Sequence, residues 1–264
     1  MIEKNLIMNQ TLKISTFQMD IEWENREINW KIIQEASKNL KTDLLVLPEM
    51  FLSGFSTDPE RVAIHEDDAI FDKLKELSVQ IDAAICGSLV VASENKFVNR
   101  MYFIHPDGKV NHYDKRHLFR MAGEDEKYTA GAIKTVVDYR GFKFCMQVCY
   151  DLRFPIWSRN SSDLTAMYDC LIYVANWPMV RSDTWISLLK ARAIENWSYC
   201  IGVNRVGKDG NGLEYDGKSA VFDFKGVKLD DHKDNIASIE TTEIEKELLN
   251  DYREKFPAYL DADI

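Results

Sequence analysis

The chain alternates short runs of β-branched and aromatic residues with long amphipathic patterns, and this alternation restricts its fold more than any other feature. Helical periodicity covers residues 26–38, 70–80 and 183–196. The strand-like runs are 12–18, 44–47, 83–91, 98–104, 110–113, 135–139, 142–148, 170–175, 199–204, 219–224 and 236–239. About ten strands interleaved with helices predict an α/β architecture, in which two sheets pack together and helices cover their outer faces.

We expect residues 1–264 to form one domain, because no Pro/Gly/Ser-rich linker, repeat or low-complexity segment divides them. A chain of this length with 45% apolar residues can bury a large core. The last segment, residues 243–256, has the pattern of a charged amphipathic helix. We expect this helix and the tail to residue 264 to pack on the domain or on a dimer partner, through Leu248, Leu249, Tyr252 and Phe256.

Charge and terminal sequence limit the partners and the compartment. The chain has 33 basic and 43 acidic residues, and a net charge of −10 has the wrong sign for binding nucleic acid. Residues 1–10 have no apolar core of signal-peptide length, and no run of 18 apolar residues occurs, so we expect no membrane partner and a cytoplasmic location. Five cysteines without framework-like spacing indicate free thiols.

Cys149 ends an apolar run and is followed at once by Tyr150-Asp151-Leu152-Arg153. It is either a core residue or a nucleophile placed at a strand end, where the next N–H can point at a substrate. Cys145 is the alternative thiol. Four extended residues separate the two α-carbons by about 13 Å, which excludes a disulfide or a shared metal within one strand. We therefore expect Cys145 to be a core residue.

Glu49 follows the apolar run 44–48, and Lys115 follows a predicted hairpin. Taken separately, each has an ordinary interpretation, as a surface acid and as a solvated lysine. Beside Cys149, however, a partly buried Glu49 would have a raised pKa and would accept the thiol proton. Lys115 would favour the thiolate and stabilise a negative oxygen in a tetrahedral intermediate. The three residues together indicate amide hydrolysis by a cysteine.

Other reactive residues carry weaker signals. No histidine belongs to a His-Glu-x-x-His pair, and Gly-x-Ser-x-Gly is absent. His117 lies two residues from Lys115, where we favour a structural role. The glycine-rich stretch 207–212 lacks the spacing and the following helix of a phosphate loop and predicts a turn. The sequence predicts no metal site.

The chain resembles the nitrilase, or carbon–nitrogen hydrolase, superfamily, and it is most similar to the omega-amidases. The resemblance runs from about residue 13 to residue 262. It is carried by the motifs Val46-Leu47-Pro48-Glu49-Met50-Phe51, Tyr113-Asp114-Lys115-Arg116-His117-Leu118-Phe119 and Val148-Cys149-Tyr150-Asp151-Leu152-Arg153-Phe154-Pro155, with similar flanks at 175–178, 191–196 and 204–207. It implies a four-layer αββα sandwich and a homodimer.

The resemblance also implies roles for individual residues. Cys149 is the expected nucleophile, Glu49 the general base and acid, and Lys115 with the backbone N–H of Tyr150 the binding site of the oxyanion. The family's second pocket glutamate corresponds to Glu124, seven residues before Gly131, with Glu126 as the alternative. No metal or organic cofactor is expected.

Omega-amidases act on monoamides of short dicarboxylates, such as 2-oxoglutaramate and succinamate, so the resemblance implies a site for a free carboxylate. Arg181 is the candidate, because a guanidinium can bind a carboxylate with two parallel hydrogen bonds; an exposed loop arginine is the alternative. We expect Arg153 to brace the cysteine turn through an internal ion pair. Aromatic residues that would wall the slot, or else belong to the core, are Phe51, Tyr150 and Trp177.

Two alternatives to the omega-amidase stay open. Another amidase of the superfamily, a carbamoylase or a nitrilase, would share Glu49, Lys115 and Cys149 and differ only in its pocket. An inactive binding or scaffold protein of the same fold is the other alternative. The intact triad disfavours it, and selective alkylation of Cys149 distinguishes it from an enzyme.

Overall fold

The protein was studied as a computed structural model that describes residues 10–94 and 96–262. Two predictions fall partly outside the described residues. They concern the absence of a signal peptide, which rests on residues 1–10, and the tail, which includes residues 263–264. None of the helices in the described part of the chain has both the length and the apolar content needed to cross a bilayer.

The first sheet contains the parallel strands β1 (Thr11–Gln18), β2 (Leu44–Val46) and β4 (Ala84–Ser93). Its other strands are β14 (Ser238–Glu245), antiparallel to β1, then β5 (Lys96–Ile104) and β6 (Val110–Asp114) in an antiparallel meander, and the short β3 (Ile64–His65). The order along the sheet is β14-β1-β2-β4-β5-β6, and β3 pairs with β4.

The second sheet has the order β13-β10-β9-β8-β7. Strands β8 (Phe142–Val148), β9 (Cys170–Ala175) and β10 (Tyr199–Asn204) are parallel, and the edge strands β7 (Val136–Tyr139) and β13 (Ala220–Phe222) are antiparallel to their neighbours. A separate hairpin joins β11 (Val206–Lys208) to β12 (Glu214–Asp216). The turn within this hairpin occupies the glycine-rich stretch, as predicted.

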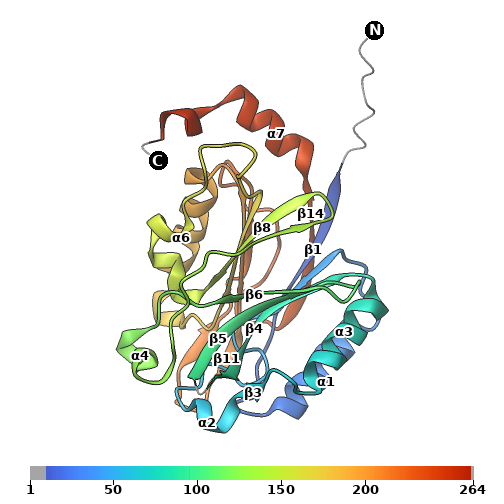
Figure 1. Cartoon of the computed structure of the whole chain (residues 1–264), viewed down its shortest axis with the longest axis vertical. Coiled ribbons are helices and arrows are strands. Elements are labelled where there is room, and N and C mark those ends of the chain that lie inside the picture. Colours follow the sequence, from blue (N-terminus) through green and yellow to red (C-terminus); the bar gives the residue numbers. More distant parts are fainter. Residues whose placement is uncertain (1–9, 95, 263–264) are drawn as a thin grey trace.

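Helices cover the outer face of each sheet, which confirms the predicted αββα sandwich (Figure 1). Helices α1 (Arg26–Ser37) and α3 (Ile70–Ile81) lie side by side on the first sheet, and α6 (Ser182–Glu195) packs on the second. Strand β2 shows why both faces of the first sheet are covered, because its side chains alternate between them. Leu44 and Val46 belong to the core between the sheets, and Leu45 belongs to the core under α1 and α3.

Shorter helices complete the chain and carry much of the site. They are α2 (Pro59–Val62), α4 (Glu124–Lys127), α5 (Pro155–Ser158) and α7 (Lys246–Lys255), with 3₁₀ turns η1 (Arg120–Ala122), η2 (Cys149–Arg153), η3 (Met179–Arg181) and η4 (Ala258–Asp261). The strands β3, β11 and β12 have two or three residues each and too little periodicity to be predicted.

The end of the chain differs from the prediction. Residues 243–245 continue β14, which pairs with β1 along its whole length, so the backbone ladder overrides the helical pattern there. Helix α7 packs on the domain through Leu249 and Arg253, and the ring of Tyr252 lies 4.7 Å from that of Phe224. The predicted contacts of Leu248 and Phe256 are not made within one chain, because both side chains are exposed.

Candidate active site

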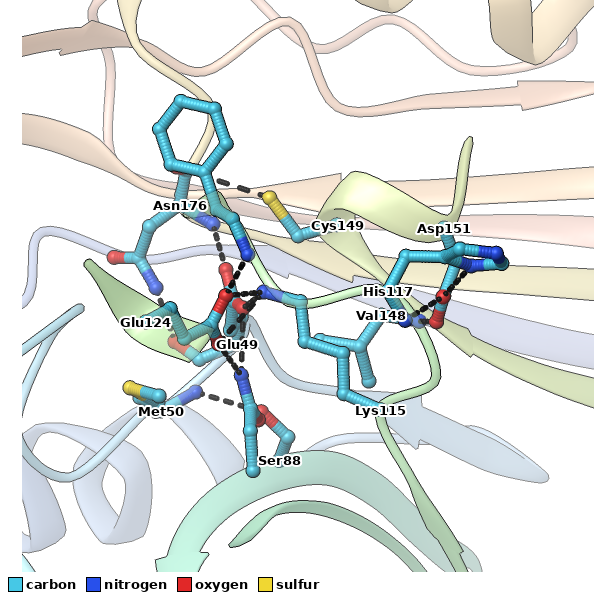
Figure 2. A network of polar contacts seen from close by, with 12 residues as sticks. Glu49, Met50, Ser88, Lys115, His117, Glu124, Val148, Cys149, Asp151 and Asn176 are labelled. Atoms are coloured by element: carbon cyan, nitrogen blue, oxygen red, sulfur yellow. Dashed lines mark hydrogen bonds and ion pairs between the residues drawn. The ribbon is translucent and has the colours of Figure 1, made fainter. Parts of the chain in front are cut away.

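The candidate site forms where strands of both sheets end. Cys149 directly follows β8, Asn176 directly follows β9, and Glu49 comes three residues after β2. Lys115 directly follows β6. Carboxyl ends of parallel strands meet at one edge of a sheet, and in this sandwich the edges of the two sheets bring these side chains together (Figure 2).

Lys115 lies between two carboxylates at the centre of the site (Figure 2). Its Nζ donates to Oε1 of Glu49 at 3.0 Å and to both carboxylate oxygens of Glu124 at 2.9 Å. All three side chains are fully buried. The interpretations of Glu49 as a surface acid and of Lys115 as a solvated lysine are therefore wrong.

The structure decides between the two candidates for the second glutamate. Glu124 is the first residue of α4, is fully buried, and also accepts a hydrogen bond from the backbone N–H of Phe119. Glu126 is exposed. Gly131 holds the backbone at Lys115, because its N–H donates to the Lys115 carbonyl at 2.9 Å. A Cβ at Gly131 would lie 2.1 Å from the carbonyl oxygen of Asp114, so only glycine allows this approach.

The charges of the cluster stabilise one another. Burial opposes the charged form of Lys115, but Glu124 and Glu49 outweigh it, and the pKa of the ammonium is raised. Burial raises the pKa of Glu124, and Lys115 opposes this shift. Asn99, also fully buried, donates its side-chain amide to Glu49 at 2.8 Å and to Glu124 at 3.4 Å. The neutral amide of Asn99 thus lies between the two carboxylates and donates to both.

Cys149 is the only one of the five cysteines with measurable exposure, 9% against 0% for the others. All five are free thiols, and Cys145 is a core residue, as predicted. The Cys149 backbone has φ of 43°, a left-handed conformation that non-glycine residues adopt mainly in tight turns and functional sites. Burial and the nearby Glu49 raise the pKa of the thiol well above its usual value. The resting nucleophile is therefore a neutral thiol that needs a base.

Asn176 links Glu49 to Cys149. Its backbone N–H donates to Oε2 of Glu49 at 2.8 Å, its side-chain amide donates to the Glu49 carbonyl at 2.6 Å, and its carbonyl oxygen lies 4.0 Å from the sulfur. Sequence reasoning noted the surrounding motif but gave this residue no role. The available signal was its position directly after the strand that neighbours β8.

Cys149 and Lys115 line a cavity of about 260 Å³. The predicted wall residues Tyr150 and Trp177 line it as well, and so does Arg181, the candidate for binding the carboxylate. Phe51 does not: its ring lies over Gly87 of β4, where the missing side chain leaves room for it, in the core beneath α1 and α3. Phe55 lines the cavity in place of Phe51.

Arg153 lies on the cavity wall, where the sequence analysis did not place it. It makes no ion pair with a carboxylate among residues 10–94 and 96–262, so the predicted internal ion pair is wrong. Its guanidinium lies 4.9 Å from the ring centre of Trp177 and lines the cavity. The carboxylate of the nearby Asp151 accepts hydrogen bonds from other donors and makes no ion pair with Arg153. Arg181 also lines the cavity, with its guanidinium 5.5 Å from the ring of Phe119.

The hairpin of β11 and β12 contributes a carboxylate, Asp209, to the cavity wall. Its oxygens already accept hydrogen bonds from the hydroxyl of Tyr215 at 2.8 Å and from the backbone N–H groups of Asn211 and Leu213. Asp209 therefore shapes the hairpin, and the cationic groups Arg153 and Arg181 remain available to an anionic ligand.

The backbone N–H of Tyr150 is the first after the nucleophile, in the first turn of η2. Amides at the start of a helix have no acceptor within it, so this N–H is free to bind a negative oxygen. Among the described residues, no three His, Cys, Asp or Glu side chains gather in a geometry that holds a metal. That the chemistry needs no metal or organic cofactor stays a prediction.

The raised pKa of Cys149 leads to a test. Because the negative charge of Glu49 disfavours the thiolate, Glu49→Gln should lower the pKa of Cys149. The rate of Cys149 alkylation by iodoacetamide, followed by mass spectrometry, should then rise at lower pH than in the unmodified protein. A curve that stays in place or moves to higher pH would contradict this electrostatic account. Glu126→Gln, an exposed glutamate, is the matched control and should leave the curve unchanged.

Comparison with known proteins agrees with this geometry. Residues 13–254 match the family described as Carbon-nitrogen hydrolase. The chain is 43% identical to "Omega-amidase YafV" of Yersinia enterocolitica, over 96% of this chain and 97% of the relative, and 32% identical to "2-oxoglutaramate amidase" of Bacillus subtilis (strain 168), over 82% and 84%. A solved CN-hydrolase superfamily protein of Xanthomonas campestris, with an arsenic adduct in its active site, superposes with a TM-score of 0.91 at 38% identity, covering 96% of this chain and 98% of that one. The chain therefore belongs to the carbon-nitrogen hydrolase family.

Proposed function

We propose that this protein is an omega-amidase, which hydrolyses the terminal amide of short dicarboxylic acid monoamides such as 2-oxoglutaramate and succinamate. The observation that carries the proposal is a cavity lined by Cys149 and Lys115 together with Arg153 and Arg181, whose guanidinium groups have no carboxylate partner among the described residues. An amide-cleaving group and a carboxylate-binding wall are what such a substrate requires. The printed names of the bacterial relatives support the same activity.

In the proposed first step, Glu49 takes the proton of the Cys149 thiol as the sulfur attacks the amide carbon. The carbonyl π electrons move to oxygen, and the Lys115 ammonium with the Tyr150 N–H stabilises the resulting negative charge. Glu49 then gives its proton to the nitrogen, the carbon–nitrogen bond breaks, and ammonia leaves. Glu124 holds Lys115 in place by accepting two of its hydrogen bonds.

The second step returns the enzyme to its starting state. Glu49, again ionised, removes a proton from a water molecule, and the hydroxide oxygen attacks the thioester carbon. The carbon–sulfur bond breaks, the carboxylic acid product forms, and the sulfur recovers the proton from Glu49. The same carboxylate thus acts as base and acid in both halves, which fits its position between Lys115 and Asn176.

The size and charge of the cavity support a small anionic substrate. A volume of about 260 Å³ lies below the range of about 300–1,000 Å³ typical of sites for drug-sized ligands. Arg181, the residue first assigned to the carboxylate, shares this wall with Arg153. We propose that both guanidinium groups bind the carboxylate, since each already packs against an aromatic ring that restricts its motion.

The alternatives differ from this proposal in the pocket. A carbamoylase or nitrilase would use the same Glu49, Lys115 and Cys149 without needing two guanidinium groups beside them. A scaffold protein would have no use for a buried lysine between two carboxylates, an arrangement whose desolvation is costly.

Three further expectations belong with the proposal. We propose that the 264 residues act as a single domain, that the protein works in the cytoplasm without nucleic acid or membrane partners, and that it forms a homodimer. Large apolar side chains that are exposed in the single chain support the dimer. They are Ile156 of α5, Leu248 of α7 and Phe256, which directly follows α7.

The first prediction concerns the substrate. Purified protein should release ammonia from 2-oxoglutaramate and succinamate, and much more slowly from a simple nitrile or a carbamoyl amino acid. Cys149→Ala should abolish release while keeping the fold, because the exchanged side chain is small and only the nucleophile is lost. Turnover of the nitrile or carbamoyl compound alone would reject the omega-amidase and keep the triad. Full activity of Cys149→Ala would reject the mechanism.

The second prediction concerns the carboxylate. Arg181→Ala and Arg153→Ala should each raise the KM for succinamate by about 10-fold to 100-fold, since a hydrogen bond to a charged group contributes about 1.5–3 kcal/mol. Activity on an uncharged short amide should change little by comparison. Arg120→Ala is the control, because this exposed arginine follows the cavity-lining Phe119 but does not itself line the cavity. If Arg181→Ala hydrolysed succinamate normally, its assignment to the carboxylate would be wrong.

The third prediction concerns assembly. Sedimentation equilibrium should give a mass of twice 30.6 kDa at micromolar protein concentration. Replacing the exposed Ile156 by aspartate should favour the single chain if α5 lies in the interface, because burying an unpaired charge is unfavourable. A mass of 30.6 kDa for the unmodified protein would reject the dimer.

A further inference from the structure

Asp151 lies two residues after the nucleophile and is fully buried, yet neither Lys nor Arg neutralises it among the described residues. Its carboxylate instead accepts four hydrogen bonds from three residues. Oδ2 accepts from the Tyr113 hydroxyl at 2.7 Å and from the Val148 N–H at 3.0 Å. Oδ1 accepts from the N–H of His117 at 2.9 Å and from its ring nitrogen Nδ1 at 2.7 Å (Figure 2).

The positions of these donors in the sequence are informative. Tyr113 comes two residues before Lys115, and His117 comes two residues after it. Val148 directly precedes Cys149. A single carboxylate therefore holds both sides of the lysine segment and the backbone that enters the nucleophile turn. These segments belong to different sheets, since β6 is in the first and β8 in the second.

The donors can keep these bonds through the reaction. A carboxylate only accepts hydrogen bonds, so Nδ1 of His117 must carry the proton, and the ring is stacked on Phe154 at 3.8 Å. The Tyr113 hydroxyl donates to Asp151 and accepts from Trp157 Nε1 at 3.0 Å and from the Arg116 N–H at 3.1 Å. Burial, with the charge of Asp151, raises the pKa of Tyr113, which keeps its proton in place.

The nucleophile needs such support because its backbone is strained. Cys149 has φ of 43°, and conformations of this kind persist only where the surroundings determine them. Asp151 binds the N–H of Val148 immediately before this strained residue and follows it in η2. The same carboxylate thus fixes the turn that presents the sulfur and the segment that presents the ammonium.

We propose that Asp151 is a positioning residue that sets the location of the Lys115 ammonium relative to the Cys149 sulfur. The inference rests on the proposed function for its effect on turnover, but its effect on the thiol does not depend on any substrate. Lys115 favours the thiolate through its charge, so displacing the ammonium disfavours ionisation of Cys149. Asp151 itself contacts neither substrate nor sulfur in this role.

The test compares Asp151→Asn with Asp169→Asn. An asparagine at 151 has a single acceptor oxygen and turns an NH₂ group towards donors, so the bridge between the sheets is broken. Asp169 is a matched control, because it is also buried and binds the Lys143 N–H, Lys246 and Arg253, away from the cavity. Both substitutions should lower thermal stability, and circular dichroism will show whether both variants are folded.

The decisive readout is the pH dependence of Cys149 alkylation. In Asp151→Asn the rate curve should move to higher pH, and kcat for monoamide hydrolysis should fall by about 100-fold with KM nearly unchanged, as for a misplaced reacting group. Asp169→Asn should show neither change. Matching behaviour of the two variants, or an alkylation curve that does not move in Asp151→Asn, would overturn the proposal.

Tyr113→Phe provides a second, milder variant that removes one donor and keeps the carboxylate. Its curve should move in the same direction by a smaller amount. If Asp151→Asn does not fold, this variant decides, and an unchanged curve and kcat would reject the positioning role. If the unmodified protein hydrolyses no monoamide, the proposed function fails, and the alkylation curves still test Asp151.

Discussion

The ion pairs between Lys115 and the carboxylates of Glu49 and Glu124 are the interaction on which the site depends. Three fully buried ionisable groups are tolerable because the ammonium lies between the two carboxylates and every ammonium proton has an acceptor. Removing Lys115 would leave two buried carboxylates without a cation. Glu49 and Lys115 follow strands of the first sheet and Glu124 begins α4, so the cluster requires this sheet and α4 to keep their relative positions. It thereby ties the chemistry of the protein to the stability of its fold.

The proposed catalytic groups and the proposed carboxylate-binding groups share one small cavity because strand ends and short turns converge there. The rigid strands β2, β8 and β9 place Glu49, Cys149 and Asn176, whereas η2 and η3 supply Arg153 and Arg181. Groups that need accurate placement thus follow directly from the sheets. The groups proposed to bind the substrate carboxylate come from turns, which can differ without disturbing the core.

Much of this arrangement was predictable from local patterns. The bounds of β8, β9 and β10 agree with the sequence, because each is a short apolar run between turn residues. The beginning of α7 was misplaced because pairing with β1 outweighs helical propensity in residues 243–245. The sequence predicted Phe51 in the pocket because it lies two residues after the candidate base Glu49, but the absence of a side chain at Gly87 lets its ring enter the core.

The sequence alone determined the family resemblance, the alternation of strands and helices, and the identities of Glu49, Lys115 and Cys149, since ordered motifs and periodicity are local properties. Only the tertiary structure decided that Glu124 and not Glu126 meets Lys115, that Arg153 lines the cavity and makes no ion pair within the described part of the chain, and that Asp151 joins two sheets. These outcomes depend on which side of a turn is buried and which distant donors reach it. No local pattern contains that information, because it depends on how the segments fold against one another; Tyr113 and Asp151, for example, meet only when the two sheets pack.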